Sequence, residues 1–112
     1  MTKKNDAAVL ERLYATIRAR RGASAKTSYT ASLFKGGKDR IARKLGEEGL
    51  EAVLATQAGD KKALVYESAD VLYHLLVAWA HAGIAPAKVW AELARREGVS
   101  GVEEKKSRSK KG

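Results

Sequence analysis

The sequence contains no cysteine and only one proline and one methionine in 112 residues. Without cysteine the chain can form neither a disulfide bond nor a thiolate metal site, which fits a reducing compartment. No apolar run reaches the roughly 18 residues that span a bilayer, so we expect no membrane partner. Acidic residues follow within a few positions of the N-terminus, a pattern unlike a signal peptide. We therefore expect a cytoplasmic protein.

β-Branched runs are also scarce, whereas alanine and leucine are frequent, and this composition favours an all-α fold. The length suits one domain, and 45% hydrophobic residues argue against intrinsic disorder. We expect residues 1–104 to form that domain. Residues 105–112 carry five positive charges and no negative charge, so we expect a disordered basic tail there.

The net charge of +9 is distributed unevenly along the chain. Residues 1–46 contain 12 Lys and Arg against three Asp and Glu, whereas residues 47–104 contain five against ten. A basic segment of this kind can bind nucleic acid or a polyphosphate substrate. Composition alone does not choose between these two classes of partner.

Apolar periodicity and capping residues predict four helices, over about residues 6–21, 39–57, 60–82 and 86–97. The segment 23–38 is rich in Ser, Thr and Gly, so we predict a loop there. The short connection AGDK makes the second and third helices antiparallel neighbours. From Ala69 to Ala82 the third helix is apolar almost all round, which suggests burial in a dimer interface. Its main apolar face is predicted to comprise Leu64, Val71, Leu72, Leu75 and Trp79.

Five carboxylates lie in two clusters with helical spacing: Glu47, Glu48, Glu51, Glu67 and Asp70. Residues three or four apart share one face of a helix, so each cluster projects its acids together. Like charges this close repel, and placement beside apolar residues adds a desolvation cost. A hard divalent cation between the clusters explains the arrangement, and oxygen ligands suit Mg²⁺ or Mn²⁺. A solvated acidic face is the alternative, but it leaves Glu48 unexplained on the apolar stripe with Ile41 and Leu45.

The acids form the pattern EExxE, then fifteen residues, then ExxD. Together with SYTASLFKGGKDRIARKLGEEGLEAVLA and ESADVLYHLLV, this pattern resembles the phosphoribosyl-ATP pyrophosphohydrolases of histidine biosynthesis, over about residues 8–108. The resemblance implies a MazG-type all-α fold of four to five helices, with a helix-bundle core completed by homodimerisation. It also implies Mg²⁺-dependent hydrolysis of 1-(5-phosphoribosyl)-ATP to 1-(5-phosphoribosyl)-AMP and pyrophosphate, the second step of L-histidine biosynthesis.

By the same resemblance, the metal ligands are Glu48, Glu51, Glu67 and Asp70. Glu47 is then an accessory catalytic carboxylate that acts beside Glu48 by orienting or deprotonating the attacking water. This assignment agrees with phosphate chemistry, because Mg²⁺ neutralises charge on the leaving oxygens and lowers the pKa of bound water.

Several polar residues around the acids are candidates for substrate binding: Ser28, Tyr29, Thr30, Lys38, Arg40 and Lys44. Arg40 and Lys44 match the family pattern and rank first, while for the lysines a solvated surface role stays open. Ser28 and Thr30 line the substrate pocket or else serve in capping and packing. His74, one turn after Asp70, either donates to a ligand carboxylate or is a hydrogen-bonded structural histidine.

Two other functions remain open at this point. One is a house-cleaning enzyme of the same superfamily that hydrolyses free nucleoside triphosphates, against which the SYT and YHLLV stretches argue. The other is a small basic nucleic-acid-binding protein, supported by the charge of +9. No helix-turn-helix, zinc or RNA-binding signature accompanies that charge, and the acids would repel a phosphate backbone, so we expect no nucleic-acid partner.

Overall fold

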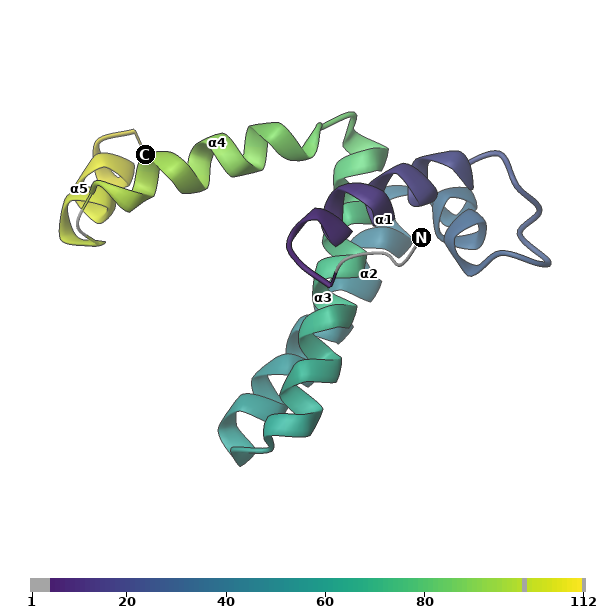
Figure 1. Ribbon diagram of the computed structural model, residues 1–112, viewed down its shortest axis with the longest axis horizontal. Coiled ribbons are helices and arrows are strands. Elements are labelled where there is room, and N and C mark those ends of the chain that lie inside the picture. The colour runs from purple at the N-terminus through teal and green to yellow at the C-terminus, as the bar shows by residue number, and fades with distance from the viewer. Residues whose placement is uncertain (1–4, 100, 112) are drawn as a thin grey trace.

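The computed structural model describes residues 5–99 and 101–111. In this part of the chain the only regular elements are helices, which confirms the all-α prediction. In chain order they are α1 (Ala8–Ala19), α2 (Tyr29–Ala58), α3 (Lys61–Ala82), α4 (Pro86–Glu97) and α5 (Gly101–Lys111). Figure 1 shows α2 and α3 as a long antiparallel pair, with α1 across one end and α4 leading away to α5. Among the described helices, none has the length and apolar character needed to cross a bilayer.

The turn between α2 and α3 forms as the sequence predicts. Gly59 ends α2 in the left-handed region at φ 69°, where a residue without Cβ is favoured. The carboxylate of Asp60 then accepts a hydrogen bond from the Ala63 amide at 3.0 Å and caps the first turn of α3. This tight connection sets the register that places the acids of α2 beside those of α3.

The loop predicted over residues 23–38 is wrong in its second half, because α2 begins at Tyr29 rather than near Asp39. The Ser28 side chain accepts from the Ala31 amide at 3.1 Å, so this serine acts as an N-cap. Leu33 behind it is fully buried in the core. The glycines that suggested a loop instead kink the helix, with Gly37 at φ 77°. Serine and glycine are common in loops, but they also serve in helix caps and kinks, so the composition of this segment did not distinguish the two.

The core lies where α1, the first part of α2 and the second half of α3 meet. It consists of Tyr14, Ile17, Leu33, Ile41, Leu76, Val77 and Ala80. The predicted apolar face of α3 is correct only in part: Trp79 packs against the core, but Leu72 is 42% exposed, and the buried Leu76 and Val77 were not predicted. A helix that is apolar all round gives no signal for which side its neighbours will cover.

Of the last two helices, α4 agrees with the prediction and α5 does not. α4 matches the predicted bounds, with Pro86 at its start, and Trp90 Nε1 donates to Glu11 at 2.7 Å. Hydrogen bonds from Arg95 and then Arg96 lower the pKa of Glu92 to about 2. Gly101–Lys111 form α5, which includes most of the segment where a disordered tail is predicted. The Lys, Arg and Glu content of this segment favours a helix. The division at residue 104 stays a prediction.

Candidate functional site

The hairpin of α2 and α3 brings the two acidic clusters together. Glu48, Glu67 and Asp70 each offer a carboxylate oxygen, and these oxygens lie within 4.8 Å of one another. All three side chains are partly buried. Carboxylates held this close from two helices repel unless a cation lies between them, and an all-oxygen donor set fits a hard divalent ion. The chemistry of the donors therefore fits the predicted metal centre.

Electrostatics identify Glu67 as the centre of the cluster. Desolvation, followed by the charges of Asp70, Glu48 and Glu51, raises the pKa of Glu67 above its ordinary value. Glu51 thus lies near enough to act on Glu67, but it is exposed and stands outside the group of oxygens within 4.8 Å. Three of the four predicted ligands are assembled, and Glu51 flanks them on the side of the hairpin turn.

The two predicted cations, Arg40 and Lys44, precede Glu48 on α2 by about two turns and one turn. Lys44 Nζ lies 3.2 Å from a carboxylate oxygen of Glu47, one turn further along the helix. The Nε of Arg40 is buried and, within the described residues, has no hydrogen-bond partner. Its stem crosses Gly36, where an added Cβ would lie 2.8 Å from the Arg40 Cβ. A buried donor without an acceptor is costly, which is consistent with the prediction that Arg40 binds substrate.

A set of aromatic and hydroxyl side chains adjoins the acids on α3. His74 Nδ1 donates to the Asp70 carbonyl at 2.8 Å, which leaves Nε2 to accept from the Tyr29 hydroxyl at 3.3 Å. These contacts fit the alternative of a hydrogen-bonded structural histidine, and a role of His74 beside the ligand carboxylates stays a prediction. Tyr29 is 49% exposed and packs against Tyr73, while Thr30 is buried and hydrogen-bonded to the Tyr73 hydroxyl.

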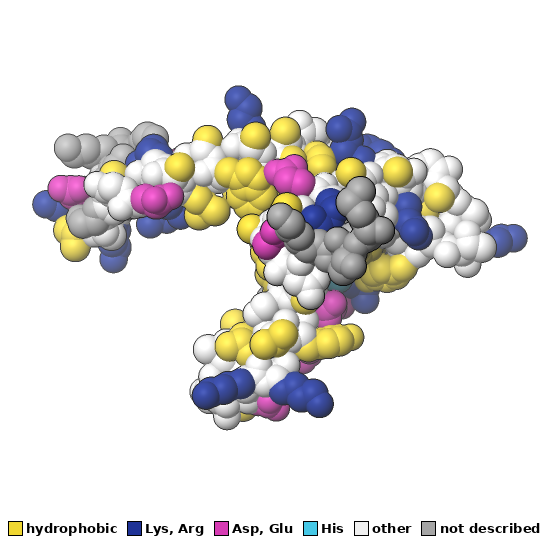
Figure 2. All heavy atoms as spheres, viewed as in Figure 1, with side chains coloured by type: hydrophobic (Ala, Val, Ile, Leu, Met, Phe, Trp, Pro, Cys, Tyr) yellow, Lys and Arg dark blue, Asp and Glu magenta, His cyan; other side chains and the backbone are white. Residues whose placement is uncertain are grey.

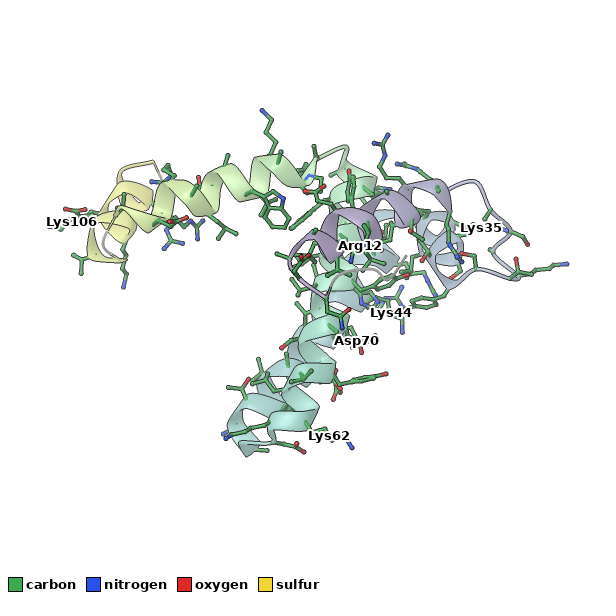
Figure 3. All side chains as sticks on the ribbon, viewed as in Figure 1. Arg12, Lys35, Lys44, Lys62, Asp70 and Lys106 are labelled. Carbon is green, nitrogen blue, oxygen red and sulfur yellow. The ribbon has the colours of Figure 1, made fainter. Side chains whose placement is uncertain are left out.

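The predicted substrate-binding residues thus divide into two groups. Ser28 and Thr30 are buried in capping and packing contacts, whereas Tyr29, Lys38, Arg40 and Lys44 keep exposed or partly exposed side chains. Figure 3 labels Asp70, Lys44 and Lys35, which lie in that order from the middle of the hairpin toward the loop before α2. Sequence reasoning missed Tyr73 as a hydrogen-bonding partner. The signal available for it was its position three residues after Asp70, on the acidic side of α3.

The raised pKa of Glu67 predicts how the metal-free protein responds to pH. A carboxyl group that holds its proton more tightly when folded stabilises the fold at low pH and loses this contribution as pH rises. In EDTA, the free energy of unfolding of the wild type should therefore fall relative to Glu67→Gln as pH rises from about 4.5 through the raised pKa. Urea denaturation of both proteins at several pH values measures this difference. A difference that is constant with pH would contradict the crowding of Glu67.

Comparison with known proteins gives one family and several close relatives. Residues 10–97 match the family model described as phosphoribosyl-ATP pyrophosphohydrolase. A protein of Azospirillum brasilense named phosphoribosyl-ATP pyrophosphatase is 58% identical over 105 residues, covering 94% of this chain and 95% of the relative. One of Paramagnetospirillum magneticum with the same name is 58% identical over 95% of this chain and 97% of its own. A relative of that name from Geobacter metallireducens is 46% identical, over 98% of this chain and 99% of the relative.

Proposed function

The chain belongs to the phosphoribosyl-ATP pyrophosphohydrolase family, and from this premise we propose that its acidic cluster binds Mg²⁺ and hydrolyses phosphoribosyl-ATP. The products are phosphoribosyl-AMP and pyrophosphate, so the protein is a hydrolase of histidine biosynthesis that cleaves a phosphoric anhydride. The observation that supports the site is the set of three carboxylates from α2 and α3 within 4.8 Å. Mn²⁺ is the alternative ion, since it accepts the same oxygen ligands.

Each acid has a proposed role in this reaction. Glu48, Glu67 and Asp70 hold the ion, and Glu51 completes the ligand set from the next turn of α2. Bound Mg²⁺ supplies charge neutralisation on the phosphate oxygens and a more acidic water. Glu47 is exposed beside the cluster, where its carboxylate can orient or deprotonate that water. The contact with Lys44 limits the rotamers of Glu47.

We infer the orientation of the bound substrate along the hairpin from the positions of the cations and Tyr29. From Glu48, α2 runs back to Lys44 and Arg40, and from Asp70, α3 runs forward to His74, in the same direction because the helices are antiparallel. We place the triphosphate beside Lys44 and Arg40, whose buried Nε then gains a phosphate acceptor. Lys38 adds positive charge at the start of this path, and Tyr29 lies beside it. Ser28 and Thr30 order the segment through their capping and packing contacts.

We also propose that the protein is a cytoplasmic homodimer. Five large apolar side chains of the hairpin are exposed, at 50–73% of their full area: Leu50, Val53, Leu54, Val65 and Tyr66. Figure 2 shows a band of apolar side chains across the lower arm of the hairpin, above the charged side chains at its tip. Two helices that pack only on each other leave much of their apolar surface in water, and a second hairpin would cover it in a four-helix arrangement.

Pyrophosphate release tests the activity. With Mg²⁺, the protein should release pyrophosphate from phosphoribosyl-ATP, and excess EDTA should stop the release until Mg²⁺ is restored. A panel of ATP, dCTP and dUTP in the same assay serves as the comparison. Preference for a free triphosphate over phosphoribosyl-ATP would contradict the substrate assignment. It would leave the proposal of a metal site unaffected. Full activity in EDTA would contradict the metal site itself.

A further inference from the structure

A second cluster of cations lies away from the acids, around a cavity of about 320 Å³ beside the first turns of α2. Its charged lining residues are Arg21 and Lys35, and the remainder of the lining is small or aromatic, including Gly22, Ala25 and Phe34. Among the residues that the structure describes, no acidic side chain lines the cavity. A concave site with two cations and no carboxylate is suited to an anion.

Arg21 is held in place by contacts that leave part of its guanidinium available. Its Nη1 donates to the Ala80 carbonyl at 3.2 Å, and its Cζ lies 5.0 Å from the centre of the Phe34 ring. Within the described residues, neither Arg21 nor Lys35 forms an ion pair. A guanidinium oriented by stacking and one backbone contact is pre-organised for a phosphate, because its other donors keep a fixed direction.

Two residues that line the cavity contact the end of α3: Arg21 at Ala80 and Phe34 at His81. The His81 ring stacks on Phe34 at 6.5 Å, so His81 marks the level of the cavity on α3. Asp70 and His81 are eleven residues apart, which places them on the same face and about 16 Å apart along the axis. Tyr29, hydrogen-bonded to His74, lies between these two levels. The acidic cluster and the residues that hold the cavity thus lie at two levels along α3.

We propose that this cavity binds the phosphomonoester at the phosphoribosyl end of the substrate, an inference that rests on the proposed function. Phosphoribosyl-ATP carries a triphosphate at one end and a single phosphate at the other, with a nucleoside between them. The acidic cluster and the cavity offer two separate sites for these two ends. Free nucleoside triphosphates lack the second phosphate, so Arg21 and Lys35 supply discrimination against them.

Two charge-removing variants and one control test the cavity. Arg21→Gln and Lys35→Gln should each raise KM for phosphoribosyl-ATP about tenfold while kcat changes less than about twofold, as expected for one lost charge-assisted hydrogen bond. The inhibition constant of ribose 5-phosphate should rise by a similar factor, and that of ATP should not change. Lys26→Gln removes one charge from the same loop, does not line the cavity, and should behave as the wild type.

Two outcomes of these kinetic measurements would contradict the proposal. Equal rises for phosphoribosyl-ATP and ATP, or no rise for either, would overturn the assignment of the cavity. Lys35 is exposed, so Lys35→Gln carries the test if Arg21→Gln does not fold after losing its contact with Ala80.

Calorimetric titration with ribose 5-phosphate separates this inference from the proposed function. Binding by the wild type that is lost in Lys35→Gln and kept in Lys26→Gln supports the cavity even in a protein that does not hydrolyse phosphoribosyl-ATP. Absence of binding at millimolar concentration overturns the cavity and leaves the hydrolase intact.

Discussion

Glu48→Gln is expected to lower kcat for phosphoribosyl-ATP hydrolysis by about 10²–10³-fold. Glu48 is the one residue of α2 in the group of three oxygens within 4.8 Å, so it closes the site from the side opposite Glu67 and Asp70. Glutamine keeps the shape of the side chain and removes its charge, so the affinity for Mg²⁺ should fall with the rate. Pyrophosphate release as a function of Mg²⁺ concentration measures both effects.

The same substitution should make the metal-free protein more stable. Glu48 is one of the charges that raise the pKa of Glu67, and its removal relieves that repulsion. Loss of activity together with a higher Tm in EDTA is therefore the expected signature, since a folding defect would lower both quantities. Glu97→Gln, an exposed change at the end of α4, should alter neither. Full activity of Glu48→Gln at low Mg²⁺ would contradict a metal site at this position.

The acidic site was predictable because it depends on short-range rules. Helical spacing fixes Glu48 relative to Glu51 and Glu67 relative to Asp70, and a four-residue turn fixes one helix relative to the other. Those rules do not extend to the orientation of individual side chains. Arg40 has a buried Nε only because Gly36 and the kink at Gly37 let its stem cross the backbone, and the sequence carries no separate signal for that arrangement.

Longer-range features could not be predicted for a different reason. Arg21 and Lys35 are fourteen positions apart and share a cavity only because α2 starts at Tyr29 and packs Phe34 against His81. Because residues 23–38 were predicted to form a loop, the first turns of α2, which create this cavity, were not expected. The uncovered face of α3 has a similar origin, since an all-apolar helix allows several arrangements and the neighbouring helices select one.

Val53→Lys is expected to convert the proposed dimer into monomers. Val53 is 58% exposed on α2 between Leu50 and Leu54, which are 57% and 50% exposed. Burial of a lysine charge among these side chains of a second copy costs several kcal/mol, so the dissociation constant should rise about a hundredfold or more. Sedimentation velocity over a range of protein concentrations measures the shift.

The control for this experiment is Val9→Lys on α1, which is 48% exposed and makes the same chemical change away from the hairpin. Val9→Lys should leave the dissociation constant as in the wild type, because α1 is not part of the proposed interface. Equal dissociation of both variants would show a general effect of added charge, and a wild-type protein that stays monomeric at micromolar concentration would remove the dimer altogether. Dissociation confined to Val53→Lys would explain why so small a chain leaves these five apolar side chains of the hairpin at least half exposed: they form the buried layer of an assembly that a single copy does not complete.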